Sequence, residues 1–158
     1  MRYRCLTDQE LQSLETEFKH FLVSHGLYAK EWRELNEQAP DKAQELVEIF
    51  SDVVFGKVVE KAEYLLHRSP QDLKLFHFED AQIQMLGLKL QAAEINLTED
   101  PYQADLGRAI HDAGAERIKL LRGKKAYQKS REEEIFALLE QGCEITDHQL
   151  FDRLASLL

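Results

Sequence analysis

Residues 40–68 read PDKAQELVEIFSDVVFGKVVEKAEYLLHR, the longest run in the chain with apolar residues at a helical period. The run stops at Ser69-Pro70, where a helix is not expected to continue. We therefore predict one long helix from Pro40 to Arg68, around which the rest of the chain is organised.

The apolar residues of this helix fall on two stripes when they are placed at about 100° per residue. The first stripe holds Ala43, Leu46, Val47, Phe50, Val53 and Val54, and the second holds Phe55, Val58, Val59, Ala62, Leu65 and Leu66. The face changes at Phe55-Gly56, so the helix either kinks at the glycine or passes between two partners. A buried core helix is the favoured interpretation, and a homodimer interface on one stripe is the alternative.

Length and composition indicate an ordinary soluble chain. The 158 residues suit one domain, with 44% apolar and 31% charged residues. A formal charge of −9 argues against general adhesion to nucleic acid or anionic membranes. Cys5 and Cys143 imply no disulfide framework or metal-binding cysteine pair. No export signal or membrane-spanning run is found, so we expect a cytoplasmic protein with reduced thiols.

The segments on either side carry local signals. Thr7 and Glu10 form a capping box that starts a helix ending at His25-Gly26, and a short helix around Trp32 precedes Pro40. We interpret Trp32 as a packing anchor between helices.

After Pro70 the pattern changes to alternation, which predicts a β-hairpin over 73–78 and 83–90. Gly87 suggests a bulge, and residues 91–97 are a candidate third strand. Three further helices are expected: from Pro101 weakly to Leu121, over 131–141, and over 146–158, the last capped by Thr146.

Together these elements predict a mostly helical α+β fold in a single domain, residues 1–158. The long central helix packs on a small antiparallel sheet, and a helical hairpin closes the chain. The expected parts are helical over 1–68, hairpin over 72–98 and helical over 100–158.

Four stretches in this order resemble a family of small uncharacterised bacterial proteins, found mainly in Bacteroidetes. The stretches are FSDVVFGKV (50–58), YLLHRSP (64–70), the hairpin with Gly87-Leu88, and KSREEEIFALLEQGCEIT (129–146). The family is a domain of unknown function, so the resemblance implies no activity and no functional residues.

The most unusual feature is the basic segment RIKLLRGKKAYQKSR, residues 117–131. Its cations are Arg117, Lys119, Arg122, Lys124, Lys125, Lys129 and Arg131, with no acid among them. The rest of the chain has 13 basic against 29 acidic residues, a balance of −16. Such a segment either solvates a helix end and pairs with Glu132–Glu134, or binds an anionic ligand or acidic partner. Only Tyr127 interleaves an aromatic, where single-strand binders stack several.

Other constellations favour plain structural roles. The C-terminal helices have a helix-turn-helix outline, but Asp147 and Asp152 would face phosphates. Glu17 and His20 have metal-ligand spacing, as do Glu60, Glu63 and His67, but both sets fall on faces away from the apolar stripes. His77 beside Glu79 is best explained as a packed core or edge histidine.

Known nucleophile and phosphate-loop motifs do not occur in the sequence. We therefore predict a non-catalytic binding or scaffolding module with its partner surface at residues 117–131. No cofactor, metal or membrane is expected, and the partner is unknown. The alternatives are a nucleic-acid or anionic-ligand binder through the same segment, and an enzyme whose site is assembled only in three dimensions.

Overall fold

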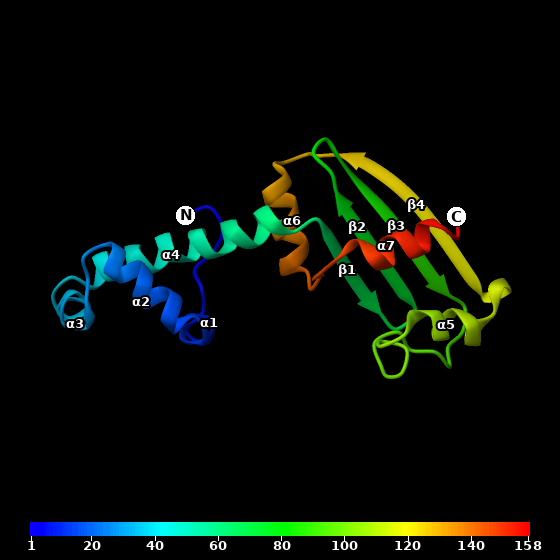
Figure 1. The fold of residues 1–158 in the computed structure, drawn as a ribbon, viewed down its shortest axis with the longest axis horizontal. Coiled ribbons are helices and arrows are strands. Elements are labelled where there is room, and N and C mark those ends of the chain that lie inside the picture. The colour runs from blue at the N-terminus through cyan, green and yellow to red at the C-terminus, as the bar shows by residue number, and fades with distance from the viewer. The chain divides into compact units, whose positions relative to one another are not determined.

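The computed structural model describes residues 1–158, with seven α-helices and a five-stranded antiparallel sheet (Figure 1), which confirms the α+β fold class. The helices are α1 (Asp8–Ser13), α2 (Glu15–Ser24), α3 (Ala29–Gln38), α4 (Pro40–Lys61), α5 (Leu106–Ala113), α6 (Arg131–Glu140) and α7 (His148–Ala155), with a short 3-10 helix, η1 (Ala115–Arg117). The strands are β1 (Tyr64–Ser69), β2 (Asp72–Phe78), β3 (Gln82–Leu90), β4 (Ile118–Ala126) and β5 (Glu144–Thr146).

The chain forms two compact units, which we call the helical unit (Met1–Glu60) and the sheet unit (Lys61–Leu158). That the whole chain behaves as one domain stays a prediction. No helix has the length and apolar character required to cross a membrane.

The start of the helical unit follows its local signals, with one difference. The capping box is confirmed, because Thr7 accepts from the Glu10 amide and Glu10 accepts from the Thr7 amide. The single helix expected up to His25 is instead broken at Leu14, whose φ of −107° and ψ of 26° leave the helical range. The predicted stop is confirmed at Gly26, which has a φ of 76°.

Aromatic rings form the centre of the helical unit. The ring centroid of Phe18 lies 5.0 Å from that of Phe50 and 5.4 Å from that of Trp32, which it meets edge to face. Leu46, Val47 and Val54 of the first stripe pack against the same cluster. Trp32 is therefore a packing anchor, as predicted.

Helix α4 is shorter than predicted. It passes Gly56 without a break but ends at Lys61, and Tyr64–Ser69 forms strand β1 instead of its last turns. Leu65 and Leu66 are both buried, and consecutive residues of a strand point to opposite faces. A strand that is buried on both faces has a continuous run of apolar residues. In the sequence this run looks like the end of an apolar helix, so β1 was predicted as helix.

The sheet has the order β4-β3-β2-β1-β5, and each neighbouring pair is antiparallel. The β2-β3 hairpin is confirmed. The bulge predicted at Gly87 is wrong, because the register runs unbroken from Asp72 opposite Lys89 to Phe78 opposite Ile83. A Cβ on Gly87 would lie 3.4 Å from Cβ of Leu121 on the next strand, which is ordinary van der Waals contact.

Three predictions for the second half need correction. The helix expected from Pro101 begins at Leu106, where Asp105 is the cap, and it ends at Gly114. Residues 118–121, expected as the tail of that helix, belong to β4. Residues 91–97 form no strand.

The two C-terminal helices are confirmed as α6 and α7, with β5 between them. Helix α7 is capped by Asp147, not by Thr146, which lies in β5.

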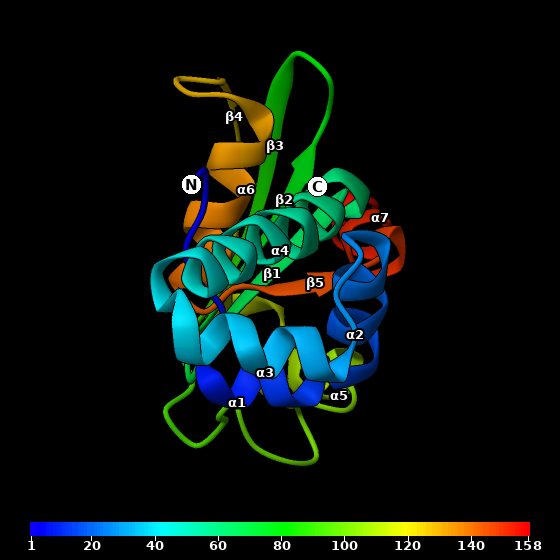
Figure 2. The same ribbon diagram turned by 90° about the vertical axis from the view of Figure 1, so that its left-hand side faces the viewer.

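Helices cover both faces of the sheet (Figures 1 and 2). Helices α5 and α7 pack on one face through Leu106, Phe151 and Leu154, which meet the alternate leucines of β2 and β3. Helix α6 lies on the opposite face, where Ala137 and Leu138 line a hollow with residues of β2 and β3. We call these the α5/α7 face and the α6 face.

Candidate functional site

The predicted basic segment forms an edge of the sheet. Its main part is β4, whose only strand neighbour is β3 (Figure 1). Alternation along the strand directs Lys119 and Lys125 to the α6 face and Arg122 and Lys124 to the α5/α7 face. The remaining cations lie just outside the strand, Arg117 before it and Lys129 and Arg131 after it. A strand, not the expected helix end, therefore presents the charges.

The two terminal arginines hold the fold together. Arg117 donates from Nε to the carbonyl of Ala113 at 2.7 Å and from Nη1 to a carboxylate oxygen of Glu94 at 2.5 Å. Arg131 donates from Nη2 to the carbonyl of Ala62 at 2.7 Å and to that of Phe78 at 3.3 Å. Both guanidinium groups are thus used within the sheet unit.

Lys125 is also paired. Its Nζ lies 3.2 Å from Oε2 of Glu134, whose side chain is 10% exposed. Glu134 Oε1 accepts from the backbone amides of Gln128 at 2.8 Å and Lys129 at 3.3 Å. Burial raises the pKa of Glu134, but these amides and Lys125 outweigh it and hold the pKa below its usual value. The pairing expected with Glu132–Glu134 is therefore present at this residue.

The middle of β4 is different. Lys119, Arg122 and Lys124 are exposed and form no ion pair, and the same holds for Lys129 in the following loop. These four side chains extend into solvent from one edge of the sheet. They are the part of the predicted site that remains available to a ligand.

The α6 face beside β4 is hollowed and partly apolar. Two shallow hollows of about 220 and 200 Å³ share Phe76, Ile83 and Lys125, and Met85 leans over Gly123 in the second. Together they make a continuous depression between α6 and the end of β4.

Two further lysines, Lys74 and Lys89, are exposed on this same face. They were not predicted as site residues, because they lie on other strands than the basic segment. The alternation of Lys74 with Leu73 and Leu75 was the available signal.

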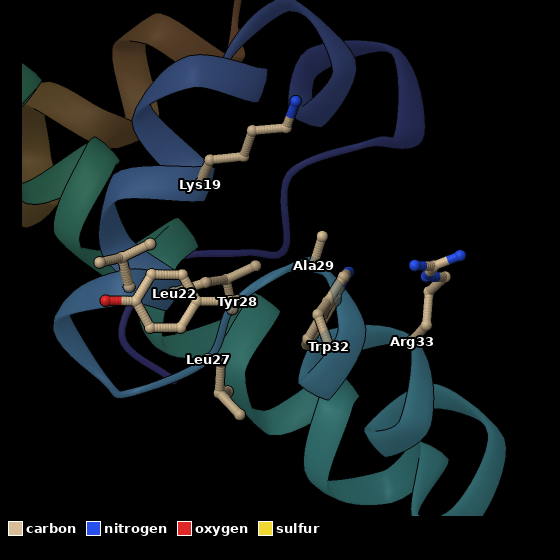
Figure 3. Close-up of a pocket in the computed structure, with 8 residues that line it drawn as sticks. Lys19, Leu22, Leu27, Tyr28, Ala29, Trp32 and Arg33 are labelled. Carbon is tan, nitrogen blue, oxygen red and sulfur yellow. The ribbon is translucent and has the colours of Figure 1, made fainter.

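A separate apolar hollow of about 380 Å³ lies in the helical unit between α2 and α3 (Figure 3). Its lining includes Leu22, Tyr28 and Trp32, with Lys19 and Arg33 at the margin. Lys19 is paired with Glu15 at 2.9 Å. The hollow thus has an apolar floor and few polar groups that converge on it.

The residues considered as metal ligands do not come together. Glu17 and His20 are exposed on α2 beside a hollow lined mainly by apolar side chains. Nowhere in the structure do three or more His, Cys, Asp or Glu side chains form a group that could hold a metal ion. Glu60, Glu63 and His67 fall on a helix, a connection and a strand respectively.

His77 is packed as predicted, and it lies on β2, the central strand of the sheet, and not on an edge. Its ring stacks on Tyr64 with centroids 4.3 Å apart, it meets Phe151 at 5.5 Å, and its Nδ1 lies 3.7 Å from Glu79. Burial, and then the nearby carboxylate of Asp152, raise the pKa of Tyr64.

Both cysteines are free thiols. Cys143 is buried, and this burial raises the pKa of its thiol, which disfavours the reactive thiolate.

Ile49 and Val53 are 49% and 42% exposed on α4. They are one helical turn apart and leave an apolar strip on the helix surface. The homodimer through this helix stays a prediction, to be checked by light scattering.

The fold and the edge strand define a protein that presents a basic β-strand on an α+β scaffold. By sequence, the chain belongs to a family of unknown function, DUF6495, whose model matches residues 1–158. No curated protein and no solved structure matches the chain.

Proposed function

We propose that the chain is a non-catalytic binding or scaffolding module that holds an anionic partner on edge strand β4. One observation carries the proposal: Lys119, Arg122 and Lys124 project from a sheet edge with no ion pair, in a chain with a formal charge of −9. The proposed setting is the cytoplasm, where Cys5 and Cys143 remain reduced.

Local charge supports this function better than overall charge does. Exposed charges are screened beyond about 8 Å at physiological salt, so an approaching partner responds mainly to the nearest side chains. Near β4 these are cations, whereas the acidic excess lies elsewhere in the chain. The surface therefore selects an anionic group by position and repels one over most of the remaining surface.

Nucleic acid is a second candidate partner, favoured by the composition of the α6 face. Lys74 is the neighbour of the partly exposed Phe76 on this face, and Met85 lies opposite Phe76. Lys89 and Lys119 lie opposite each other further along the sheet, where Asp72 also lies opposite Lys89. Exposed cations near a partly exposed aromatic ring suit contacts to phosphates and a stacked base. Binding of this kind weakens steeply as salt rises, because phosphate contacts release counterions.

A charge-reversal experiment tests the proposed function. We would measure fluorescence polarisation of two labelled probes, an acidic peptide of roughly ten residues and a single-stranded oligonucleotide of similar length. The double variant Arg122→Glu with Lys124→Glu is expected to weaken binding of the preferred probe at least about tenfold, equivalent to about 1.4 kcal/mol.

The matched control is Lys30→Glu with Arg33→Glu, which reverses two exposed cations of α3 in the helical unit. It makes the same change in net charge and should leave the affinity within about twofold, because neither residue belongs to the basic strand. Equal losses in both double variants, or no loss in either, would reject the β4 surface.

A further inference from the structure

Besides its charged side chains, β4 has backbone N–H and C=O groups that point away from β3. In an antiparallel pair, residues that exchange hydrogen bonds alternate with residues whose N–H and C=O point away from the partner strand. The amide of Gln91 donates to the carbonyl of Arg117 at 2.8 Å, which places this pair among those bonded across β3 and β4. The amide of Leu90 donates to Gln71 on the other side, as alternation requires.

The register then assigns every residue of β4. Lys119, Leu121, Gly123 and Lys125 face β3 with their backbone groups. The outward groups belong to Ile118, Leu120, Arg122, Lys124 and Ala126. No strand borders β4 on that side. The N–H of Ile118 donates to the carbonyl of Ala115, whereas the outward groups from Leu120 to Ala126 have no strand partner within the protein.

This edge is a better template than the other one. Strand β4 has nine residues, whereas β5, at the opposite edge, has three. Unpaired edges invite strand addition, and lysines are a common protection against it. On β4 this protection is selective, because its cations repel a basic strand but attract an acidic one.

Charge also excludes one obvious occupant, a second copy of the same strand. Two β4 strands side by side would bring Lys119, Arg122, Lys124 and Lys125 of one chain near those of the other, where like charges oppose pairing. The complementary occupant is acidic and extended.

We propose that the partner is an acidic peptide segment that adds to the outer edge of β4 as a sixth strand. This rests on the proposed function and specifies how the anionic partner is held. Main-chain hydrogen bonds to Leu120, Arg122 and Lys124 provide the register, as in other cases of strand addition. Acidic side chains of the peptide lie on the same face of the sheet as Arg122 and Lys124, and its alternate apolar side chains lie on the α6 face.

Two substitutions of Arg122 distinguish the contribution of the backbone hydrogen bond from that of the side-chain charge. Arg122→Pro removes one outward N–H without touching the bonds to β3, and proline is accepted at such edge positions. Arg122→Gln removes the same charge but keeps the N–H. With a labelled peptide of alternating valine and glutamate, we expect a loss of about threefold for glutamine and at least a further tenfold for proline.

Amide hydrogen exchange of the unmodified protein gives an independent result, which also decides the matter if the proline variant does not fold. On addition of the peptide, the amides of Leu120, Arg122 and Lys124 should become protected at least about tenfold. Those of Leu121 and Gly123, already bonded to β3, should change little. An alternating pattern supports strand addition, and uniform or absent protection overturns it.

The outcomes separate the two proposals. Equal affinities of the glutamine and proline variants would overturn strand addition while leaving an anion-binding surface in place. An oligonucleotide that displaces the peptide and binds both variants equally would overturn it in favour of nucleic acid. If charge reversal at Arg122 and Lys124 has no effect on any probe, the proposed function itself fails.

Discussion

Nζ of Lys125 lies 3.2 Å from Oε2 of Glu134, and this contact joins the end of β4 to the first turn of α6. Glu134 also accepts two backbone amides of the connecting loop, so one carboxylate fixes the path of the chain from strand to helix. Within the basic segment, Arg117, Lys125 and Arg131 are thus engaged inside the sheet unit, whereas Lys119, Arg122, Lys124 and Lys129 form no ion pair.

Removing this carboxylate should destabilise the sheet unit. Glu134→Ala leaves the amides of Gln128 and Lys129 and the Lys125 ammonium without their acceptor, and we expect a loss of about 1–3 kcal/mol in the free energy of unfolding. Urea unfolding followed by far-ultraviolet circular dichroism measures it.

Glu133→Ala is the matched control for this prediction. Glu133 also lies in the first turn of α6, and its side chain is exposed. The control loses only the interaction with the helix dipole, worth about 0.3–1 kcal/mol. A Glu134 variant no less stable than this control would contradict the bridging role.

Arg131 should behave as a structural residue although the sequence places it in the basic segment. Its guanidinium donates to the carbonyls of Ala62 and Phe78, and hydrogen bonds of charged donors contribute about 1.5–3 kcal/mol. Arg131→Ala should therefore lower the unfolding free energy by about that amount and leave the affinity of folded protein for an acidic peptide within about twofold.

Lys129→Ala should show the opposite behaviour, with unchanged stability and weaker binding. Urea titration measures the stability of the two variants, and fluorescence polarisation on the same samples measures their affinity for the acidic peptide. A loss of affinity in folded Arg131→Ala as large as in Lys129→Ala would return Arg131 to the binding surface.

Local signals explain how much of the fold was predictable. The Thr7 capping box and the Gly26 stop depend on residues three or four positions apart, and both are present. The alternation in β2 and β3 identifies a hairpin because its two strands are neighbours in sequence. Strand β1 was missed although it pairs with the neighbouring strand β2, because its continuous apolar run was interpreted as the end of a helix. Strand β4 was missed because its pairing is distant: Leu120 of β4 lies opposite Leu88. Nothing within a short window reveals such a partner.

The proposed binding surface was predicted only in part for the same reason. The cluster of cations is visible in composition, but availability depends on partners elsewhere in the chain. Arg117 is engaged by Glu94, and Arg131 by Ala62 and Phe78. The sequence therefore indicates where the charge is, while the structure separates structural cations from the exposed ones.

Two glycines of the helical unit should respond oppositely to alanine. Gly56 lies inside α4, and a Cβ there meets nothing within 4 Å, so Gly56→Ala should stabilise the unit by about 0.5–1 kcal/mol. Gly26 is equally open but has a φ of 76°, so Gly26→Ala should cost about 1–2 kcal/mol. Trp32, the only tryptophan, reports unfolding of this unit by fluorescence. A destabilised Gly56→Ala variant would contradict an uninterrupted helix.

Acid should weaken the helical unit through Glu10. Two guanidinium hydrogen bonds from Arg4, at 2.8 and 2.9 Å, and the Thr7 amide lower the pKa of Glu10 from 4.5 to about 2. Because the folded pKa lies below the unfolded one, this stabilisation is complete above about pH 4.5 and is lost as the pH falls towards 2.

The Glu10 side chain is 39% exposed, so solvent screening reduces the contribution to about 1 kcal/mol. Glu10→Gln should be less stable than the natural chain by that amount at pH 7, and the difference in Trp32-monitored urea unfolding should shrink towards pH 2. In an Arg4→Met background most of the difference should vanish at every pH, and a difference independent of both pH and Arg4 would contradict the ion pair as its source.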